Sequence, residues 1–214
     1  MKLYYIVMAD IIRSRSYDGA DLLPTFSSLV EECNEVHRGE LLSPYTVTLG
    51  DEFQGVTRTL HAAVESIFYL EEALLAATPP FRLRYVILYG EIDTAINPHV
   101  AHGMSGPGLT AARESLTRKR RGRQRFQLQL PGFPLVDELR MLFRLLDLLV
   151  GHWKEKDFAL IRELIKSNDD ASVAATFGKT RSQVWKRRKT LQTEEYLTVK
   201  QLIRSLVDHS EEAG

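Results

Sequence analysis

The fold is decided near the start of the chain, by the stretch LYYIVMADII at residues 3–12. The stretch is continuously apolar and rich in β-branched and aromatic side chains, which is the pattern of a buried β-strand. It is shorter than the roughly 20 apolar residues that a membrane helix needs, and it lacks the cleavage site of a signal peptide. We therefore predict a strand here, and no membrane segment in the chain.

The next residues predict a regular order of helices and strands. Asp21 is suited to cap a helix that runs to about His37, and Gly50-Asp51 is a strong hairpin signal. Strands are expected at Tyr45–Leu49, Glu52–Val56, Phe81–Ile92 and Arg125–Leu130, and helices at Leu60–Ala76 and Gly106–Leu116. The first part of this order, βαββαβ, is typical of a ferredoxin-like antiparallel sheet with two helices on one face.

The second half of the chain is predicted to be helical. Pro131-Gly132-Phe133-Pro134 interrupts the pattern, and beyond it we find only helical spacing. The expected helices are Leu135–Trp153, Asp157–Lys166, Ala171–Phe177, Arg181–Leu191 and Glu195–Val207. The fold class is therefore α+β, with a ferredoxin-like palm domain at residues 1–132 and an all-α domain at residues 133–214.

The balanced composition hides two oppositely charged halves. The 214 residues carry 28 basic and 28 acidic side chains, which alone argues against a nucleic-acid partner. Residues 1–112, however, hold 7 basic and 14 acidic side chains, whereas residues 113–214 hold 21 and 14. The basic residues concentrate in Arg113–Arg125 and Lys179–Lys189. Such clusters indicate either a solvated surface or contact with phosphates.

Two aspartates are expected to meet at one edge of the sheet. Asp10 ends the first strand and Asp51 lies at the tip of the hairpin, and in a palm sheet the first strand pairs with the hairpin. Convergent carboxylates are ligands for Mg²⁺ or Mn²⁺. The alternative is that Gly50-Asp51 only forms a turn and that Asp10 only ends a strand. Glu52 is expected to point to the opposite face from Asp51, and it is not assigned to the site.

Four motifs follow one another in the first half. They are Met8-Ala9-Asp10-Ile11, then Thr48-Leu49-Gly50-Asp51-Glu52-Phe53, then Arg82–Tyr89 with Gly90-Glu91, and Gly106-Pro107-Gly108 leading to Ala111-Ala112-Arg113. In this order they resemble the class III nucleotidyl cyclase and GGDEF palm, over roughly residues 3–130. The resemblance implies that Asp10 and Asp51 bind Mg²⁺ or Mn²⁺ and that Ile11 offers its backbone carbonyl to a second metal. It also implies that Arg113 faces the triphosphate of a nucleoside triphosphate.

Two positions depart from the cyclase pattern. Leu109 stands where cyclases have an Asn that stabilises the transition state, and Thr46, Val47 and Thr48 stand near the place of a base-reading Lys. Phosphoryl transfer depends on such positioned donors, so cyclisation of ATP or GTP is not expected. The aspartate pair leaves a metal-dependent nucleotidyl or phosphoryl transferase as an alternative function.

The whole chain is also similar to the SatD family, which is bacterial. The similarity is carried by ADIIRSR at Ala9–Arg15 and GDEFQG at Gly50–Gly55, and it spans both halves. It implies a bacterial cytoplasmic protein and names no reaction. The lone Cys33 agrees with a reducing compartment, since it excludes an intramolecular disulfide.

Residues 170–186 resemble a helix-turn-helix. Ala174 lets two helices cross closely, Gly178 suits the turn, Thr180 can cap the second helix and Val184 returns to the core. The residues expected to contact DNA are Thr180, Arg181, Ser182, Gln183, Trp185, Lys186, Arg187 and Lys189. The first of these would read base edges and the later basic ones would contact phosphates. The alternative is a helical interaction bundle with a solvated basic face.

Together these patterns predict a DNA-binding regulatory protein whose palm-like domain senses a nucleotide or a metal. Operators are usually read by symmetric dimers, so we expect a homodimer. The run Arg118–Arg125 either extends the DNA surface, holds the phosphates of a nucleotide or forms a loop.

Overall fold

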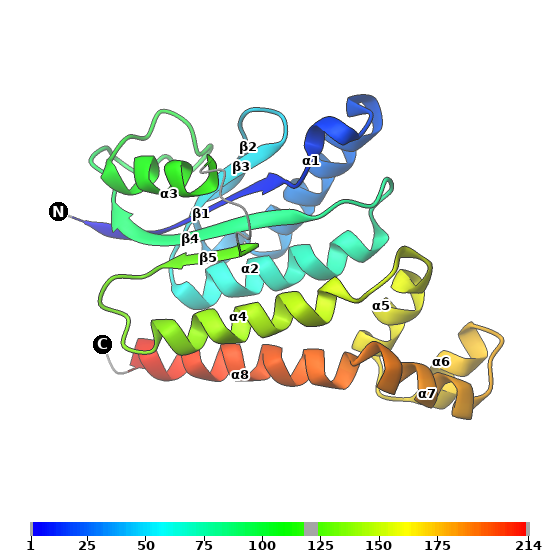
Figure 1. Cartoon of the computed structure of the whole chain (residues 1–214). Helices are drawn as coiled ribbons and strands as arrows, with labels where there is room; N and C mark the ends of the chain where they lie inside the picture. Colours follow the sequence, from blue (N-terminus) through cyan, green and yellow to red (C-terminus); the bar gives the residue numbers. More distant parts are fainter. Residues whose placement is uncertain (1, 118–123, 213–214) are drawn as a thin grey trace.

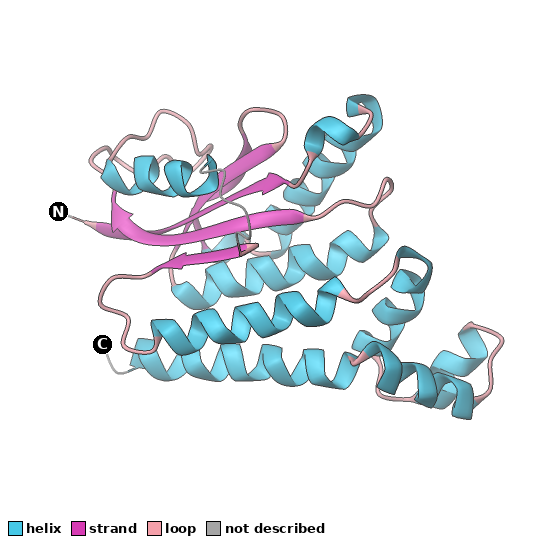
Figure 2. Cartoon of the chain, in the orientation of Figure 1, coloured by secondary structure: helices cyan, strands magenta, loops and turns pink. Residues whose placement is uncertain are grey.

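The predicted first strand is the central strand of a five-stranded sheet (Figures 1 and 2). The computed structural model describes residues 2–117 and 124–212. The sheet order is β2-β3-β1-β4-β5, with β4 and β5 parallel and the other neighbours antiparallel. The strands are β1 Leu3–Ile11, β2 Leu41–Val47, β3 Glu52–Thr57, β4 Leu83–Glu91 and β5 Phe126–Gln129. The α+β class and the βαββαβ order are confirmed, and β5 adds a parallel edge strand.

Helices cover both faces of the sheet and form a further layer beneath it (Figure 1). Helices α1 (Gly19–Val36) and α2 (Leu60–Ala73) pack on one face, and α3 (Pro107–Thr117) packs on the other. The C-terminal helices are α4 Val136–Gly151, α5 Phe158–Lys166, α6 Asp170–Thr176, α7 Arg181–Leu191 and α8 Thr193–Glu212. Short 3-10 turns are η1 Ser14–Ser16, η2 Arg38–Glu40, η3 Leu74–Ala76 and η4 Glu155–Asp157. None of the described helices is long and apolar enough to span a membrane.

Two local expectations are wrong. Helix α1 is capped by Asp18, whose carboxylate accepts a hydrogen bond from the Ala20 N–H at 2.9 Å, and Asp21 lies in the first turn. Strand β2 begins at Leu41 and not at Tyr45. Register shifts on both sides of Ser43 interrupt its pairing with β3, and such bulges disturb the alternation from which a strand is predicted.

One apolar core is shared by both halves of the chain. In β1, Val7 and Ala9 belong to the main core, whereas Ile6 and Met8 lie under α3, because successive side chains of a strand point to opposite faces. The main core continues through α2 into α4 and α8, where Phe143 and Ile203 are buried. The predicted boundary near residues 131–134 falls in a turn beside this shared core, and the division into two domains stays a prediction.

Arg125 joins the sheet half to the helical half through buried ion pairs. Its guanidinium donates to Glu71 on α2 at 2.7 and 2.8 Å and to Asp147 on α4 at 2.7 Å. The Arg125 side chain is only 6% exposed. This arginine therefore belongs to the core and not to a phosphate-binding surface, while residues 118–123 of the same basic run lie outside the described residues.

The outer edge of β2 is closed by a side chain from α1. The amide of Asn34 accepts a hydrogen bond from the Tyr45 backbone N–H and donates one to the Tyr45 carbonyl, both at 2.8 Å. The preceding residue, Pro44, has no N–H to offer. The middle of this edge strand thus keeps few backbone groups for pairing with another strand.

Candidate functional site

Three charged side chains form a row across the end of the sheet. Asp10 on β1 lies opposite Glu52 on β3 and opposite Arg84 on β4 in the strand register. Asp10 and Arg84 lie two residues from Met8 and Val86 of the apolar cluster beneath α3, and Glu52 lies four residues from Val56 of that cluster. Even spacings keep side chains on one face, so all three belong to the α3 face of the sheet. The carboxylate that shares a face with Asp10 is therefore Glu52, which the sequence did not assign to the site.

Asp10 is already paired with a cation of the protein. Arg84 donates from Nε to Oδ1 of Asp10 at 2.9 Å, and its Nη2 donates to the other carboxylate oxygen. The side chains are 20% and 26% exposed for Asp10 and Arg84. Bidentate pairs of this kind are the stronger class of ion pair, so the negative charge of Asp10 is largely compensated within the sheet.

Asp51 lies beside the end of β1, but its carboxylate has a different partner. The Asp51 carbonyl accepts a hydrogen bond from the Ile11 N–H at 2.9 Å, which ties the hairpin to the first strand. The Asp51 carboxylate accepts a hydrogen bond from the Ser14 hydroxyl at 2.5 Å. The Ile11 side chain is buried in the main core, on the opposite face from Asp10. The backbones of the two aspartates are thus brought together, while their carboxylates bind different neighbours.

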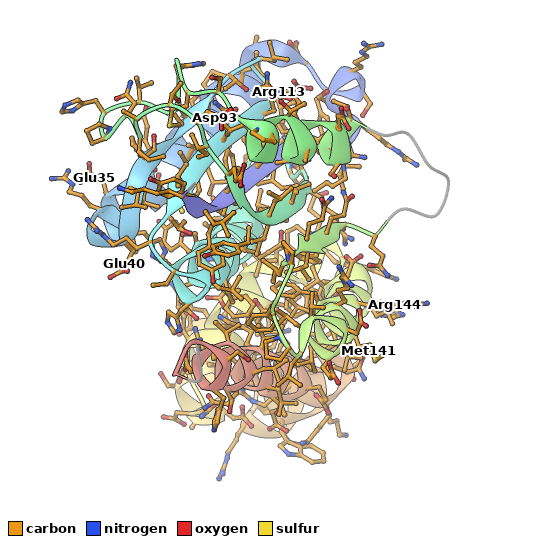
Figure 3. All side chains as sticks on the ribbon, turned by 90° about the vertical axis from the view of Figure 1, so that its left-hand side faces the viewer. Glu35, Glu40, Asp93, Arg113, Met141 and Arg144 are labelled. Carbon is orange, nitrogen blue, oxygen red and sulfur yellow. The ribbon has the colours of Figure 1, made fainter. Side chains whose placement is uncertain are left out.

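Arg113 lines a polar cavity next to this row. Its Nη2 donates to Oε1 of Gln54 at 2.9 Å and lies 3.6 Å from Oε1 of Glu52. Helix α3 approaches the sheet closely because Gly108 has no side chain, and a Cβ there would lie 2.8 Å from the Glu91 carbonyl oxygen. The cavity measures about 630 Å³ and is lined by the hairpin, the 102–106 loop and α3. In Figure 3, Arg113 is labelled beside α3 at the top of the molecule.

Leu109, which replaces the cyclase asparagine, packs into the apolar cluster under α3. Its side chain is 8% exposed, although it also borders the Arg113 cavity. The hairpin contributes Thr48 to the same cavity, and the Thr48 hydroxyl donates to Oε1 of Glu52 at 2.8 Å. The cavity therefore has a leucine side chain where cyclases have the asparagine and a threonine hydroxyl near the place of the lysine, beside the Arg113 guanidinium.

The residues present do not form a ready metal site in this arrangement. Among the described residues, no three His, Cys, Asp or Glu side chains are grouped so that they could hold a metal ion. Both oxygens of Asp10 are bonded to Arg84, and a dication would have to compete with that guanidinium. The arrangement suits an anionic ligand at Arg113 better than a metal between Asp10 and Asp51.

The turn between α6 and α7 has the local geometry that the sequence predicts. Gly178 adopts a positive φ of 59°, which favours glycine. Thr180 and Gln183 form a capping box, because the Thr180 hydroxyl accepts from the Gln183 N–H and the Gln183 amide oxygen accepts from the Thr180 N–H at 2.9 Å. Two of the residues expected to contact DNA are therefore engaged in the cap.

The remaining residues of α7 divide into paired and exposed side chains. Arg187 donates to Asp157 at 2.5 Å, and Lys189 pairs with Glu194. Val184, Arg188 and Leu191 are buried. Arg181, Ser182, Trp185 and Lys186 are exposed, with Trp185 at 52%, and among the described residues they have no side-chain partner. An exposed tryptophan beside two free cations is typical of a binding surface.

Sequence reasoning missed Glu52, Arg84 and Gln54. Each lies opposite a residue of β1 in the sheet: Glu52 and Arg84 lie opposite Asp10, and Gln54 lies opposite Met8. Asp10, Glu52 and Arg84 were all visible as polar residues in apolar strands. Only the register of the strands brings them together. That register depends on how β1 pairs with β3 and β4, which the residues of one strand do not reveal by themselves.

Comparison with known families gives a match over nearly the whole chain. The model of the SatD family matches residues 4–207 of the 214. No curated protein matches the chain.

Several solved structures are similar at low sequence identity. The catalytic core of a rhodopsin-guanylyl cyclase with converted specificity, in complex with ATPαS, is 18% identical with a TM-score of 0.43, covering 56% of this chain and 75% of that chain. The guanylate cyclase domain of RhGC from Catenaria anguillulae, in complex with GTP, is 18% identical with a TM-score of 0.40, covering 56% and 76%. The guanylyl cyclase Cya2 is 13% identical with a TM-score of 0.40, covering 54% and 69%.

Proposed function

The chain belongs to the SatD family, and from this premise we propose that it is a bacterial, cytoplasmic DNA-binding regulator whose palm-like half senses a phosphorylated nucleotide. The observation that carries the proposal is the exposed face of α7, where Arg181, Trp185 and Lys186 lack partners among the described residues. The α6–α7 pair would act as a helix-turn-helix, with α7 in the major groove.

The expected contacts on α7 follow from which side chains are free. Arg181 and Ser182 lie in the first turn, where recognition helices meet base edges. Lys186 lies one turn further along and suits a phosphate contact. Thr180 and Gln183 support the helix through the cap, and Arg187 and Lys189 would bind DNA only by exchanging their carboxylate partners.

The Arg113 cavity supports the sensing role. Its volume of about 630 Å³ is within the range of pockets for small ligands. A guanidinium that is 47% exposed beside hydroxyl groups and glycine backbone suits a phosphate group. A nucleoside triphosphate would place one phosphate on Arg113, and a divalent ion, if bound with it, would be held by the nucleotide as well as by Asp51.

The homodimer expected for an operator-binding protein has a candidate surface on α4. Met141, Leu145 and Leu148 form an apolar stripe that is 68%, 43% and 55% exposed. Figure 3 shows Met141 and Arg144 on the outside of this helix. Exposed apolar stripes of this kind are typical of subunit interfaces, and light scattering measures the resulting mass.

DNA binding is tested by fluorescence anisotropy with promoter fragments from upstream of the gene itself. We expect Arg181→Ala to weaken binding to the preferred fragment and to relax its sequence preference, at a cost of about 1–3 kcal/mol. Lys186→Ala should weaken binding to all fragments. It should also lower the slope of log affinity against log salt concentration by about one. Arg58→Ala, an exposed arginine of the sheet half, is the matched control. Equal weak binding to all fragments, unchanged in these variants, contradicts the proposal.

A metal-dependent nucleotidyl or phosphoryl transferase is the second candidate function. It is favoured by the hydrogen bond that holds Asp51 beside the end of β1, next to the Arg113 cavity. Activity would require Asp10 to leave Arg84 when a metal-bound nucleotide arrives. Incubation with nucleoside triphosphates and Mn²⁺, followed by mass spectrometry, tests it: turnover that is lost in Asp51→Asn supports this function, and absence of product at high protein concentration removes it.

A further inference from the structure

A second cavity is lined by residues of α1, α2 and α5; Figure 1 labels these three helices. It measures about 670 Å³ and lies between helices of the sheet half and a helix of the C-terminal half. Leu29 of α1, Leu75 after α2 and Ile165 of α5 give it an apolar lining. Both its size and its mixture of apolar and charged residues are typical of small-molecule sites.

Two cations of α5 line this cavity without a partner. Arg162 and Lys166 lie one helical turn apart, and neither forms an ion pair or a side-chain hydrogen bond with any described residue. Arg162 is half-buried. The other buried or half-buried arginines in the described part of the chain all donate to a carboxylate or a backbone carbonyl, namely Arg82, Arg84, Arg125, Arg140, Arg187, Arg188 and Arg204. Arg162 thus lacks the acceptor that a partly desolvated guanidinium needs.

The opposite wall restricts the charge of a ligand. Glu72 is neutralised by Lys200, but Glu32 has no cationic partner among the described residues. The Tyr69 hydroxyl stays protonated, because burial and the neighbouring Glu32 raise its pKa. A ligand with several negative groups would place one of them near Glu32. A single anionic group at α5 with an apolar body toward the other walls avoids that repulsion.

We propose that this cavity binds a small amphipathic monoanion, an organic carboxylate or sulfonate whose head group pairs with Arg162 and Lys166. The ligand class differs from the phosphorylated nucleotide of the Arg113 cavity, and the inference does not depend on that function. The site adjoins the anchor of α7, because Arg188 donates to the backbone carbonyls of Leu164 and Ser167 at the end of α5, both at 2.8 Å. A bound ligand would therefore contact α5, the helix to whose end α7 is bonded through Arg188.

The test is a fluorescence titration of the full chain with 8-anilinonaphthalene-1-sulfonate, an amphipathic monoanion. We expect saturable binding that octanoate displaces and that octylammonium and ATP do not. Arg162→Gln with Lys166→Gln should weaken the affinity by about tenfold or more, the loss typical of a charge-assisted hydrogen bond. The matched control, Arg144→Gln with Lys154→Gln, removes the same charge from exposed positions and should stay within about twofold.

Circular dichroism melting of each variant separates a lost site from a lost fold, and Ala73→Phe provides a second route by filling the cavity without changing charge. Binding that is unchanged in Arg162→Gln with Lys166→Gln overturns the proposal. So does displacement by octylammonium as strong as by octanoate, because it would assign the head group to Glu32. Absence of saturable binding also overturns it.

Discussion

Cys33, on α1, is fully buried, and burial raises the pKa of its thiol to about 12. The thiolate is the reactive form, so we expect a disulfide reagent to leave the native protein unmodified in mildly alkaline buffer and to modify it at once in denaturant. Release of the reagent's coloured thiolate measures both rates. Fast modification of the native protein would contradict the burial of this residue.

The same pKa shift predicts how stability depends on pH. The ordinary thiol pKa is 9.0, so above this value ionisation favours the unfolded chain. The contribution of Cys33 to stability is therefore fully present below pH 9.0 and declines as the pH rises toward 12.

Arg84 decides whether the end of the sheet can bind a cation. We expect Arg84→Gln to remove the guanidinium that bonds both oxygens of Asp10 and to raise the affinity for Mn²⁺ by about tenfold or more, since a dication at ~4 Å from a unit charge gains roughly 2 kcal/mol even at the dielectric constant of water. Isothermal titration with Mn²⁺ measures the affinity, and Arg58→Gln is the control with an exposed arginine. An affinity that does not change shows that Arg84 is not what keeps the metal out.

Single side chains were the part of the site that the sequence predicted least well. Asp10 and Asp51 were identified from local patterns alone. Asp10 is a polar residue at the end of an apolar strand, and Asp51 lies in a hairpin turn. The role of Arg84 depends on facing Asp10 across two strands. Asp10 and Arg84 are 74 residues apart in the sequence, and no pattern in the sequence indicates that they form a pair.

At the level of elements, the start of α7 depends on its capping box. We expect Thr180→Ala to reduce the free energy of unfolding by about 1 kcal/mol, and Gln183→Ala to cost less on its own. The two changes should couple in a double-mutant cycle, because each cap bond positions the other. Urea unfolding measures these values, and Ser182→Ala, which removes no cap, is the control. Additive losses would contradict a reciprocal cap.

The α6–α7 turn could be predicted because its causes are local. Gly178 with its positive φ and Thr180 with its cap act within a few residues of each other. Strand β2 shows the opposite case. Its register shifts depend on its pairing with β3, and its Tyr45 backbone is bonded by Asn34 of α1. An element whose geometry is set by distant partners loses its pattern in the sequence.

At the scale of the whole molecule, Arg125 is expected to make the two halves unfold together. Arg125→Ala leaves Glu71 buried at 4% side-chain exposure without its cation, which should cost about 3–5 kcal/mol. Arg38→Ala, which removes an exposed pair with Glu35, should cost less than about 1 kcal/mol.

Urea unfolding followed by tryptophan fluorescence and by far-ultraviolet circular dichroism should give one coincident transition for the wild type. Two separate transitions would show that the shared core does not couple the halves.

The closed edge of β2 has a consequence for assembly. With Asn34 bonded to Tyr45 and Pro44 lacking an N–H, the middle of one outer edge of the described sheet is occupied. At the other outer edge, the Leu128 carbonyl of β5 accepts hydrogen bonds from the Arg140 guanidinium of α4 at 2.8 and 3.1 Å. Both outer strands therefore have backbone groups engaged by helix side chains, so we expect copies of this chain to associate through helices and not by joining their sheets.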